Sequence, residues 1–203
     1  MKIICIGNNY AKHIAELKST KPDEPLFFLK PDSAILGKNT SFYIPSFSND
    51  LQYEVEVLVK ICKVGKYIDS VFSHKYYEEI GLGIDFTARD IQKKCKEKGL
   101  PWEKAKAFDG SAVIGDFFSK GSLGDLQDLP FTLQKNGEEV QVGNTRSMLW
   151  SVDELISYVS QFITLKKGDL IFTGTPAGVG PVVEGDLLVG ALNGIKALEV
   201  KIK

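Results

Sequence analysis

The sequence is poor in several features that would point to a function by themselves. Its 203 residues contain only three cysteines, at positions 5, 62 and 95, and no CxxC pair. This number and spacing exclude a disulfide framework and a zinc–thiolate site, and they favour reduced thiols in a cytoplasmic protein. The 25 lysines and arginines balance 26 aspartates and glutamates, so the formal net charge is −1. Without an excess of positive charge, we expect neither a nucleic acid nor an anionic membrane as partner.

Long apolar runs are also missing. No stretch approaches the roughly 18 consecutive apolar residues of a transmembrane helix, so we expect no membrane span. The apolar N-terminus stops at Gly7, which is too short for the core of a signal peptide and agrees with a cytoplasmic location. The glycine-rich segment 173–180 matches neither GxGxxG nor a P-loop, which disfavours nucleotide binding. A small molecule is therefore the expected partner.

Hydrophobic patterning predicts a strand-rich α+β protein that forms a single domain over residues 1–203. The length fits one domain, and neither a repeat nor a long linker divides it. The predicted strands are residues 2–6, 26–30, 41–44, 52–59, 80–85, 133–135, 138–142, 169–173, 187–192 and 196–202. Asn136-Gly137 predicts the turn of a hairpin.

Three helices are predicted, each from its capping residues or its apolar spacing. The first covers residues 8–17 and is capped by an asparagine. The second covers residues 87–98, with a Thr87-x-x-Asp90 capping signal at its start and Gly99 at its end. The third covers residues 151–162, where apolar side chains recur at helical spacing.

Acidic residues on two of the predicted strands form the first candidate site. Glu54 and Glu56 are two apart, so they project to one face, either as the solvent-exposed face of an edge strand or as part of a site. Asp85 ends the apolar run 80–84 and is either a helix-start residue or a ligand carried by a buried strand. Three converging carboxylates without histidine or cysteine would suit Mg²⁺, Mn²⁺ or Ca²⁺ better than zinc.

Three further features could carry chemistry. His13 and Glu16 lie three apart, so on a helix they form either a surface pair or a general base with its orienting carboxylate. Lys106 stands between two alanines and is either a cation facing a ligand or a snorkelling surface lysine. The loop 173–180 is either a plain turn or a place where backbone N–H groups and a threonine hydroxyl receive a small carboxylate.

In this order the motifs resemble those of the fumarylacetoacetate hydrolase family, most closely its short acylpyruvase and oxaloacetate decarboxylase members. The matching segments are residues 7–16 (GNNYAKHIAE), 28–31 (FLKP), 53–56 (YEVE), 85–92 (DFTARDIQ), 99–106 (GLPWEKAK), 143–145 (GNT) and 174–180 (GTPAGVG). The resemblance runs from Ile4 to about Asp186. Residues 60–67 and 108–111 depart from the usual pattern, which leaves the identity of the substrate open.

The resemblance implies a fold, a set of ligands and a set of roles. The implied fold is a mixed β-sandwich or roll, generally dimeric, with a lid over residues of about 8–22. The implied metal ligands are Glu54, Glu56 and Asp85, with Mg²⁺ or Mn²⁺ as the cation and Ca²⁺ as a further candidate. The implied catalytic residues are the base His13 with Glu16, and Lys106 and Gln92, which would stabilise an oxyanion near the substrate. The implied substrate-binding residues are Arg89, Thr175 and Gly174.

The implied activity is metal-dependent hydrolysis of a C–C bond in acylpyruvate-type 2,4-dioxo acids, such as acetylpyruvate or fumarylpyruvate, through a pyruvate enolate. Oxaloacetate decarboxylation or tautomerisation and isomerisation of 2-hydroxyhepta-2,4-diene-1,7-dioate use the same enolate chemistry and stay open as alternatives. A non-enzymatic, cation-binding β module is an alternative of another class. It leaves Lys106 and the loop 174–180 without a role.

Overall fold

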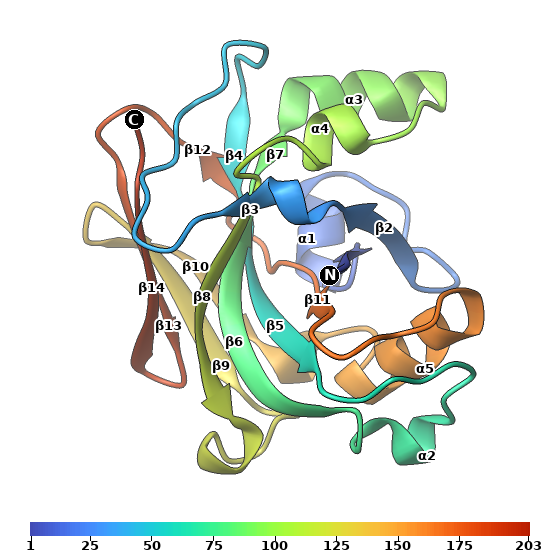
Figure 1. Cartoon of the computed structure of the whole chain (residues 1–203). Helices are drawn as coiled ribbons and strands as arrows, with labels where there is room; N and C mark the ends of the chain where they lie inside the picture. Colours follow the sequence, from blue (N-terminus) through green and yellow to red (C-terminus); the bar gives the residue numbers. More distant parts are fainter.

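The computed structural model describes residues 1–203, and its regular structure is mainly strand, with five short α-helices (Figure 1). The strands are β1 (Ile3–Gly7), β2 (Leu26–Lys30), β3 (Ile35–Leu36), β4 (Leu51–Tyr53), β5 (Val55–Ile61), β6 (Tyr77–Asp85), β7 (Thr87–Ala88), β8 (Ala112–Ser119), β9 (Pro130–Lys135), β10 (Glu138–Asn144), β11 (Leu170–Phe172), β12 (Gly180–Pro181), β13 (Leu187–Leu192) and β14 (Ile195–Lys201). The helices are α1 (Ala11–Glu16), α2 (Ser70–Ser73), α3 (Arg89–Lys98), α4 (Glu103–Lys106) and α5 (Val152–Phe162). The prediction of a strand-rich α+β fold is confirmed.

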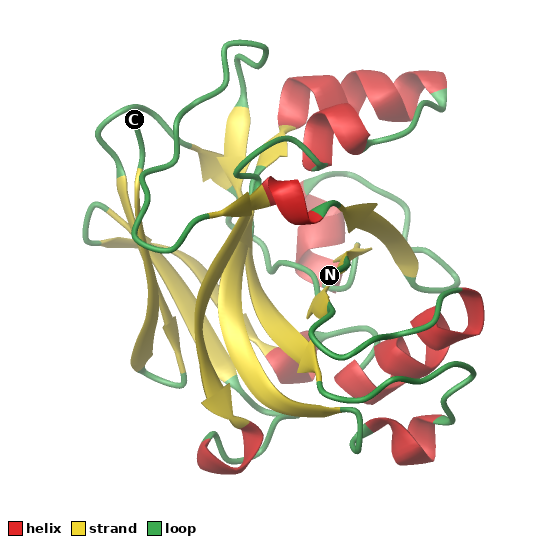
Figure 2. Cartoon of the chain, in the orientation of Figure 1, coloured by secondary structure: helices red, strands yellow, loops and turns green.

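The strands form three sheets. The largest has the order β2-β1-β11-β5-β6-β8-β3, the second β10-β9-β13-β14, and the third β12-β4-β7. β13 and β14 pack against β6, and β9 packs against β5, so the second sheet covers one face of the first. Figure 2 shows the α-helices gathered on the side away from that second sheet. None of the helices combines the length and the apolar character that a membrane crossing requires.

β5 and β6 lie in the middle of the large sheet, and both of their faces are covered. The apolar residues of β5 are at most 1% exposed. A strand that is covered on both faces needs apolar residues on both, which explains the run 80–84. Glu56 lies opposite Gly83 in this internal pair, and the Asp85 amide donates to the Glu54 carbonyl oxygen at 2.8 Å. The interpretation of Glu54 and Glu56 as the solvent-exposed face of an edge strand is therefore wrong.

Local signals predicted some element ends and missed others. The turn Asn136-Gly137 has positive φ at both residues, and Gly99 ends α3 with φ of 63°. Residues 41–44 form no strand, because only Phe42 makes a single bridge to Ile202. α1 begins at Ala11, after Tyr10, since Asn8 adopts a left-handed conformation that interrupts the helix before it.

The predicted capping signal at the start of α3 is also wrong. Thr87 lies on β7, and Ala88 precedes the helix without any side-chain hydrogen bond to it. Asp90 instead accepts from the Ser48 hydroxyl at 2.7 Å. The Thr87 hydroxyl is thereby left free to face the candidate site, where it has a different partner.

Candidate active site

The three predicted acids meet at the end of the central strands. Glu54 lies between β4 and β5, Glu56 lies on β5, and Asp85 ends β6. Each offers a carboxylate oxygen, and these oxygens all lie within 4.8 Å of one another. All three side chains are buried, with exposed fractions of 5%, 2% and 1%. Buried like charges at this separation repel strongly, so the cluster requires compensating positive charge.

Lysine and arginine side chains compensate two of the three acids. The Lys106 ammonium donates to Glu54 Oε2 at 2.7 Å and to Asp85 Oδ2 at 2.9 Å, and Arg89 donates to Glu54 Oε1. Burial alone would raise the pKa of Glu54, but Lys106 and Arg89 outweigh it and hold the pKa below its ordinary value. The same two acids raise the pKa of Lys106, against the effect of its burial. Lys106 is therefore a buried, charged member of the cluster and not a snorkelling surface lysine.

Glu56 has no cationic partner. Its one hydrogen bond comes from the Gly174 amide, which donates to Oε2 at 2.7 Å. Gly174 has φ of 101°, and a Cβ there would lie 2.8 Å from the Asn9 Cβ, so glycine is required for this approach. Burial, with Asp85 and Glu54 close by, raises the pKa of Glu56. Glu56 is thus the acid at which positive charge is missing.

The cluster fits a hard divalent cation. Its donors are carboxylate oxygens alone, which is the donor set that Mg²⁺, Mn²⁺ and Ca²⁺ prefer. Asp85 Oδ1 is buried and accepts no hydrogen bond, although Lys30 Nζ lies 2.7 Å from it with unsuitable hydrogen-bond geometry. Both Asp85 oxygens thus have a lysine ammonium nearby, whereas Glu56 keeps a buried carboxylate without a cationic partner, which a bound cation would supply.

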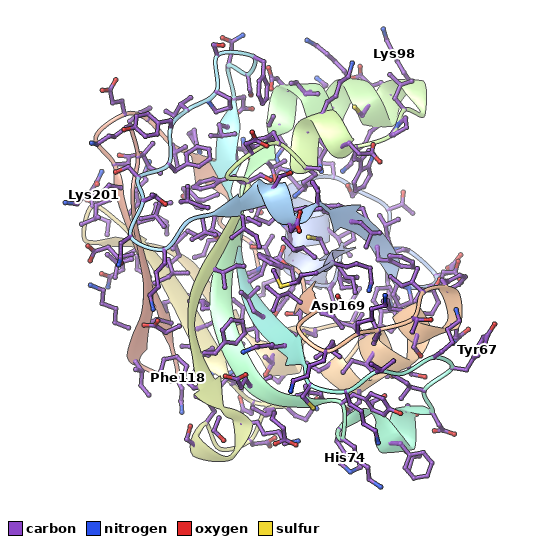
Figure 3. The ribbon with its side chains drawn as sticks, in the orientation of Figure 1. Tyr67, His74, Lys98, Phe118, Asp169 and Lys201 are labelled. Carbon is purple, nitrogen blue, oxygen red and sulfur yellow. The ribbon has the colours of Figure 1, made fainter.

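His13 lies over this cluster on α1. Its Nδ1 is 3.1 Å from Glu16 Oε2, and the ring is 5% exposed. Because a carboxylate only accepts, Nδ1 carries the proton and Nε2 is left with a free lone pair. Burial lowers the pKa of His13 more than Glu54 and Glu16 raise it, so the neutral imidazole is favoured. The second histidine, His74, is exposed and projects from the lower edge of the molecule in Figure 3.

α3 brings Arg89 and Gln92 to the same cleft. Arg89 donates from Nε to Gln52 Oε1 at 2.8 Å and from Nη1 to Gln92 Oε1 at 2.7 Å. The Gln92 carbonyl oxygen is thus occupied, and its amide N–H groups are left to face a bound molecule. Gln92 is 5% exposed, so an unused donor there lies in a nearly dry environment.

The loop after β11 contributes mainly to the protein's own framework. Thr175 Oγ1 donates to the Val55 carbonyl at 2.9 Å and accepts from Gln141 Nε2 at 2.9 Å. The Gly178 amide donates to Glu16 Oε1 at 3.0 Å, which ties the loop to α1. The Gly174 amide and the Thr175 hydroxyl, which were predicted to bind a substrate carboxylate, therefore already have hydrogen-bond partners within the protein. Thr175 still lines the cleft.

Four residues of the site were not singled out from the sequence as functional residues. The fully buried Lys30 bonds to the Lys106 carbonyl oxygen and to the Ser111 hydroxyl, at 3.0 Å for the latter. Thr87 Oγ1 accepts from the Lys106 ammonium at 2.6 Å. Lys96 and Trp102 line the cleft. The available signal in the sequence was that a lysine, Lys30, ends a predicted strand whose other residues are all apolar.

Comparison with known proteins places the chain in one family. The model of the fumarylacetoacetate (FAA) hydrolase C-terminal family matches residues 2–203. Oxaloacetate tautomerase FAHD1, mitochondrial, of Mus musculus is 42% identical over 201 residues, which cover 99% of this chain and 91% of the relative. Oxaloacetate tautomerase YcgM of Escherichia coli (strain K12) is 41% identical over 194 residues, covering 95% and 89%.

A solved structure has the same fold as this chain. The crystal structure of fumarylpyruvate hydrolase from Pseudomonas aeruginosa in complex with Mn²⁺ and pyruvate superposes with a TM-score of 0.93 at 37% identity, covering 100% of this chain and 89% of the other. The family model matches nearly the whole length, and the structure brings together the three acids that the resemblance implied as ligands. The chain therefore belongs to the fumarylacetoacetate hydrolase family.

Proposed function

We propose that this protein catalyses metal-dependent proton transfer at C3 of a 2-oxo acid, with the keto–enol interconversion of oxaloacetate as its reaction. The observation that carries the proposal is one cleft lined by both His13 and the three acids Glu54, Glu56 and Asp85. Enolisation requires a base and a stabilised enolate, and an imidazole with a free Nε2 beside a candidate cation site can supply both. The two relatives named oxaloacetate tautomerases support the choice of substrate.

The residues divide the chemistry between them. Glu54, Glu56 and Asp85 would hold a divalent cation, which supplies Lewis-acid charge that makes the hydrogens at C3 of a 2-oxo acid more acidic. His13 Nε2 takes the C3 proton in one direction and returns it in the other, while Glu16 keeps the proton on Nδ1. Gln92 donates its amide N–H groups to oxygen atoms that gain negative charge.

Entry of a substrate requires α1 to move. The space enclosed by the residues of the cleft is about 30 Å³, enough for water but not for a four-carbon acid. His13 and Leu17, which belong to α1 and its end, line that space. The Glu16–Gly178 bond holds α1 against the loop after β11 and would have to break or shift. This agrees with the predicted lid over residues of about 8–22.

Hydrolysis of acylpyruvates is the second candidate, and the His13–Glu16 pair favours it. The same Nε2 that takes a proton from carbon can take one from water, which would then attack the distal carbonyl of a 2,4-dioxo acid. A structural relative at 37% identity is named a fumarylpyruvate hydrolase and was crystallised with Mn²⁺ and pyruvate. Both reactions need His13, whereas loss of CO₂ from oxaloacetate needs no base.

The test compares three reactions of purified protein with Mn²⁺: oxaloacetate tautomerisation, oxaloacetate decarboxylation and acetylpyruvate cleavage. We expect wild-type protein to accelerate tautomerisation only with the cation. His13→Ala should lower that rate by about 10²–10⁴-fold, the usual contribution of an acid–base group. Any decarboxylation should survive the substitution. The exposed histidine provides the control, since His74→Ala should leave all rates unchanged.

Two results would contradict the proposal. Equal tautomerisation by His13→Ala and wild-type protein would show that another group moves the proton. Tight Mn²⁺ binding without turnover of any 2-oxo acid would favour the cation-binding module. A homodimer and a cytoplasmic location stay predictions, and sedimentation analysis and cell fractionation test them.

A further inference from the structure

Lys96 differs from the other cations of the cleft because its charge has no partner. Arg89, Lys96 and Lys106 line the cleft. Arg89 pairs with Glu54, and Lys106 pairs with Glu54 and Asp85. Lys96 makes neither an ion pair nor a side-chain hydrogen bond with the protein. Lys96 is exposed at the rim of the cleft, where partial desolvation and the nearby charge of Arg89 lower its pKa, so a negative group beside it would be stabilised.

The geometry of α3 directs Lys96 toward the candidate active site. Residues 89, 92 and 96 are spaced at three and four, so they share one face of the helix. Side chains on a helix tilt toward its N-terminus, which for Lys96 is the end that carries Arg89. Lys94 lies two residues from both Gln92 and Lys96, on the opposite face, and does not line the cleft. The last lysine of the helix, Lys98, projects away from the molecule in Figure 3.

An aromatic wall connects the inner end of the cleft with Lys96. The rings of Phe28 and Trp102 have centroids 5.7 Å apart. The Lys106 ammonium lies 5.4 Å from the Phe28 centroid, and the Lys96 ammonium lies 5.4 Å from the Trp102 centroid. The wall therefore has a cation at each end. The inner one is occupied by Glu54, Asp85 and the Thr87 hydroxyl, and the outer one, which has no carboxylate partner, is available to a ligand.

We infer that Lys96 binds the second carboxylate of a 2-oxo dicarboxylic acid whose 2-oxo acid end lies at the Glu54, Glu56 and Asp85 cluster. The ligand would lie along the Phe28–Trp102 wall between the two ends. Lys96 is then the residue that makes the cleft prefer dicarboxylates over monocarboxylates of the same length. This assignment deepens the proposed function, since oxaloacetate is such a dicarboxylate, and it rests on the proposal for the position of the 2-oxo acid end.

The test measures binding without turnover. Calorimetry on the full chain with Mn²⁺ compares 2-oxoglutarate with 2-oxopentanoate, which has a methyl group where 2-oxoglutarate has its distal carboxylate. We expect wild-type protein to bind 2-oxoglutarate about 10–100-fold more tightly, as for one charge-assisted hydrogen bond. Lys96→Met should abolish the preference by weakening 2-oxoglutarate alone, and Lys96→Arg should retain most of it. Lys94→Met, on the opposite face, should behave as wild type.

A kinetic measurement separates specificity from structural damage. In Lys96→Met, KM for oxaloacetate should rise about 10–100-fold while kcat stays within about twofold, because the contact is made equally in ground and transition states. The inference would be overturned if Lys96→Met weakened the binding of 2-oxoglutarate and 2-oxopentanoate equally. It would also be overturned if wild-type protein showed no preference for 2-oxoglutarate. Lys96-dependent preference without any turnover would keep the subsite and refute the proposed function. Turnover of oxaloacetate without any Lys96-dependent preference would keep the proposed function and refute the subsite.

Discussion

The inner end of the cleft and its rim are constructed differently. At the inner end, Glu54, Glu56 and Asp85 lie on or next to strands β5 and β6 and are almost completely buried, and the buried Lys106 of α4 has three hydrogen-bond partners among the residues of the site. At the rim, α1 carries His13 with a partly exposed Glu16, and α3 carries Lys96, which has Trp102 beside it but no carboxylate partner. The acids that must keep a fixed geometry are thus placed on or beside internal strands of a sheet, where packing limits their movement.

Movements and substitutions at the rim of the cleft should have little effect on the stability of the large sheet. α1 has six residues and contacts the loop after β11 through Glu16, whereas β5 is hydrogen-bonded to a strand on each side. Substrate preference and lid movement therefore depend on elements that contribute little to the core, as is common for binding residues on peripheral segments. The predictions below separate the two regions.

The largest effect is expected at Glu56, the acid without a cation. Glu56→Gln keeps the shape of the side chain and removes a buried carboxylate that has no cationic partner and whose pKa burial raises, so the metal-free protein should melt at a higher temperature than wild type. Mn²⁺ affinity should fall by at least about 100-fold, since even residues that only orient metal ligands contribute 10–100-fold. Thermal melts with and without Mn²⁺ measure both quantities.

The exposed acid Glu199 supplies the control for that experiment. Glu199→Gln should leave the Mn²⁺-induced rise in melting temperature unchanged, because its partner Lys196 is also at the surface. A Glu56→Gln protein that is less stable than wild type without metal would show that the charge is compensated by a contact other than those described. Unchanged Mn²⁺ affinity would remove Glu56 from the ligand set.

The next largest effect is expected in the free energy of unfolding, when a lysine is removed from a buried ion pair and from an exposed one. Lys30 and Asp85 are 2.7 Å apart with side chains at most 1% exposed, whereas Lys38 and Asp116 are 2.9 Å apart at 77% and 56%. Lys30→Met should lower the free energy of unfolding by about 3–5 kcal/mol, because it removes the partner of a buried charge. Lys38→Met should change it by less than about 1 kcal/mol. Urea denaturation measures both, and similar losses would contradict the difference between the regions.

Much of this arrangement follows from the sequence, and the missing parts have physical reasons. The alternation and apolar runs predicted a strand over residues 52–59 that contains Glu54 and Glu56 and a strand over residues 80–85 that ends at Asp85, but they could not show that the two strands are neighbours. Pairing between β5 and β6 depends on the register, which places Val55 opposite Ile84. That contact between distant segments brings Glu54 and Asp85 together, and it has no local signature.

The cations of the site were harder to predict than its acids. Lys30 is buried because the Ser111 hydroxyl and the Lys106 carbonyl accept from it, and both come from segments far along the chain. β8 and α4 carried weak signals, since Ala112–Ser119 mixes small, polar and aromatic residues and α4 has only four residues. Lys96 was one of several lysines on α3, and only Trp102 beside it distinguishes it.

The smallest effect is expected in the pH dependence of the reaction. Burial places the pKa of His13 below its ordinary value of 6.5, and protonated His13 cannot take a proton, so kcat/KM should fall on the acidic side with a midpoint below 6.5. Glu16 raises the pKa of His13 through its hydrogen bond and its charge. Glu16→Gln retains an acceptor but removes the charge, so the midpoint should move further down, by less than about one unit. A bound cation adds positive charge and shifts the midpoint in the same direction. Stopped-flow rates between pH 4.5 and 8 measure the midpoint, and an upward shift in Glu16→Gln would show that the base is a group other than His13.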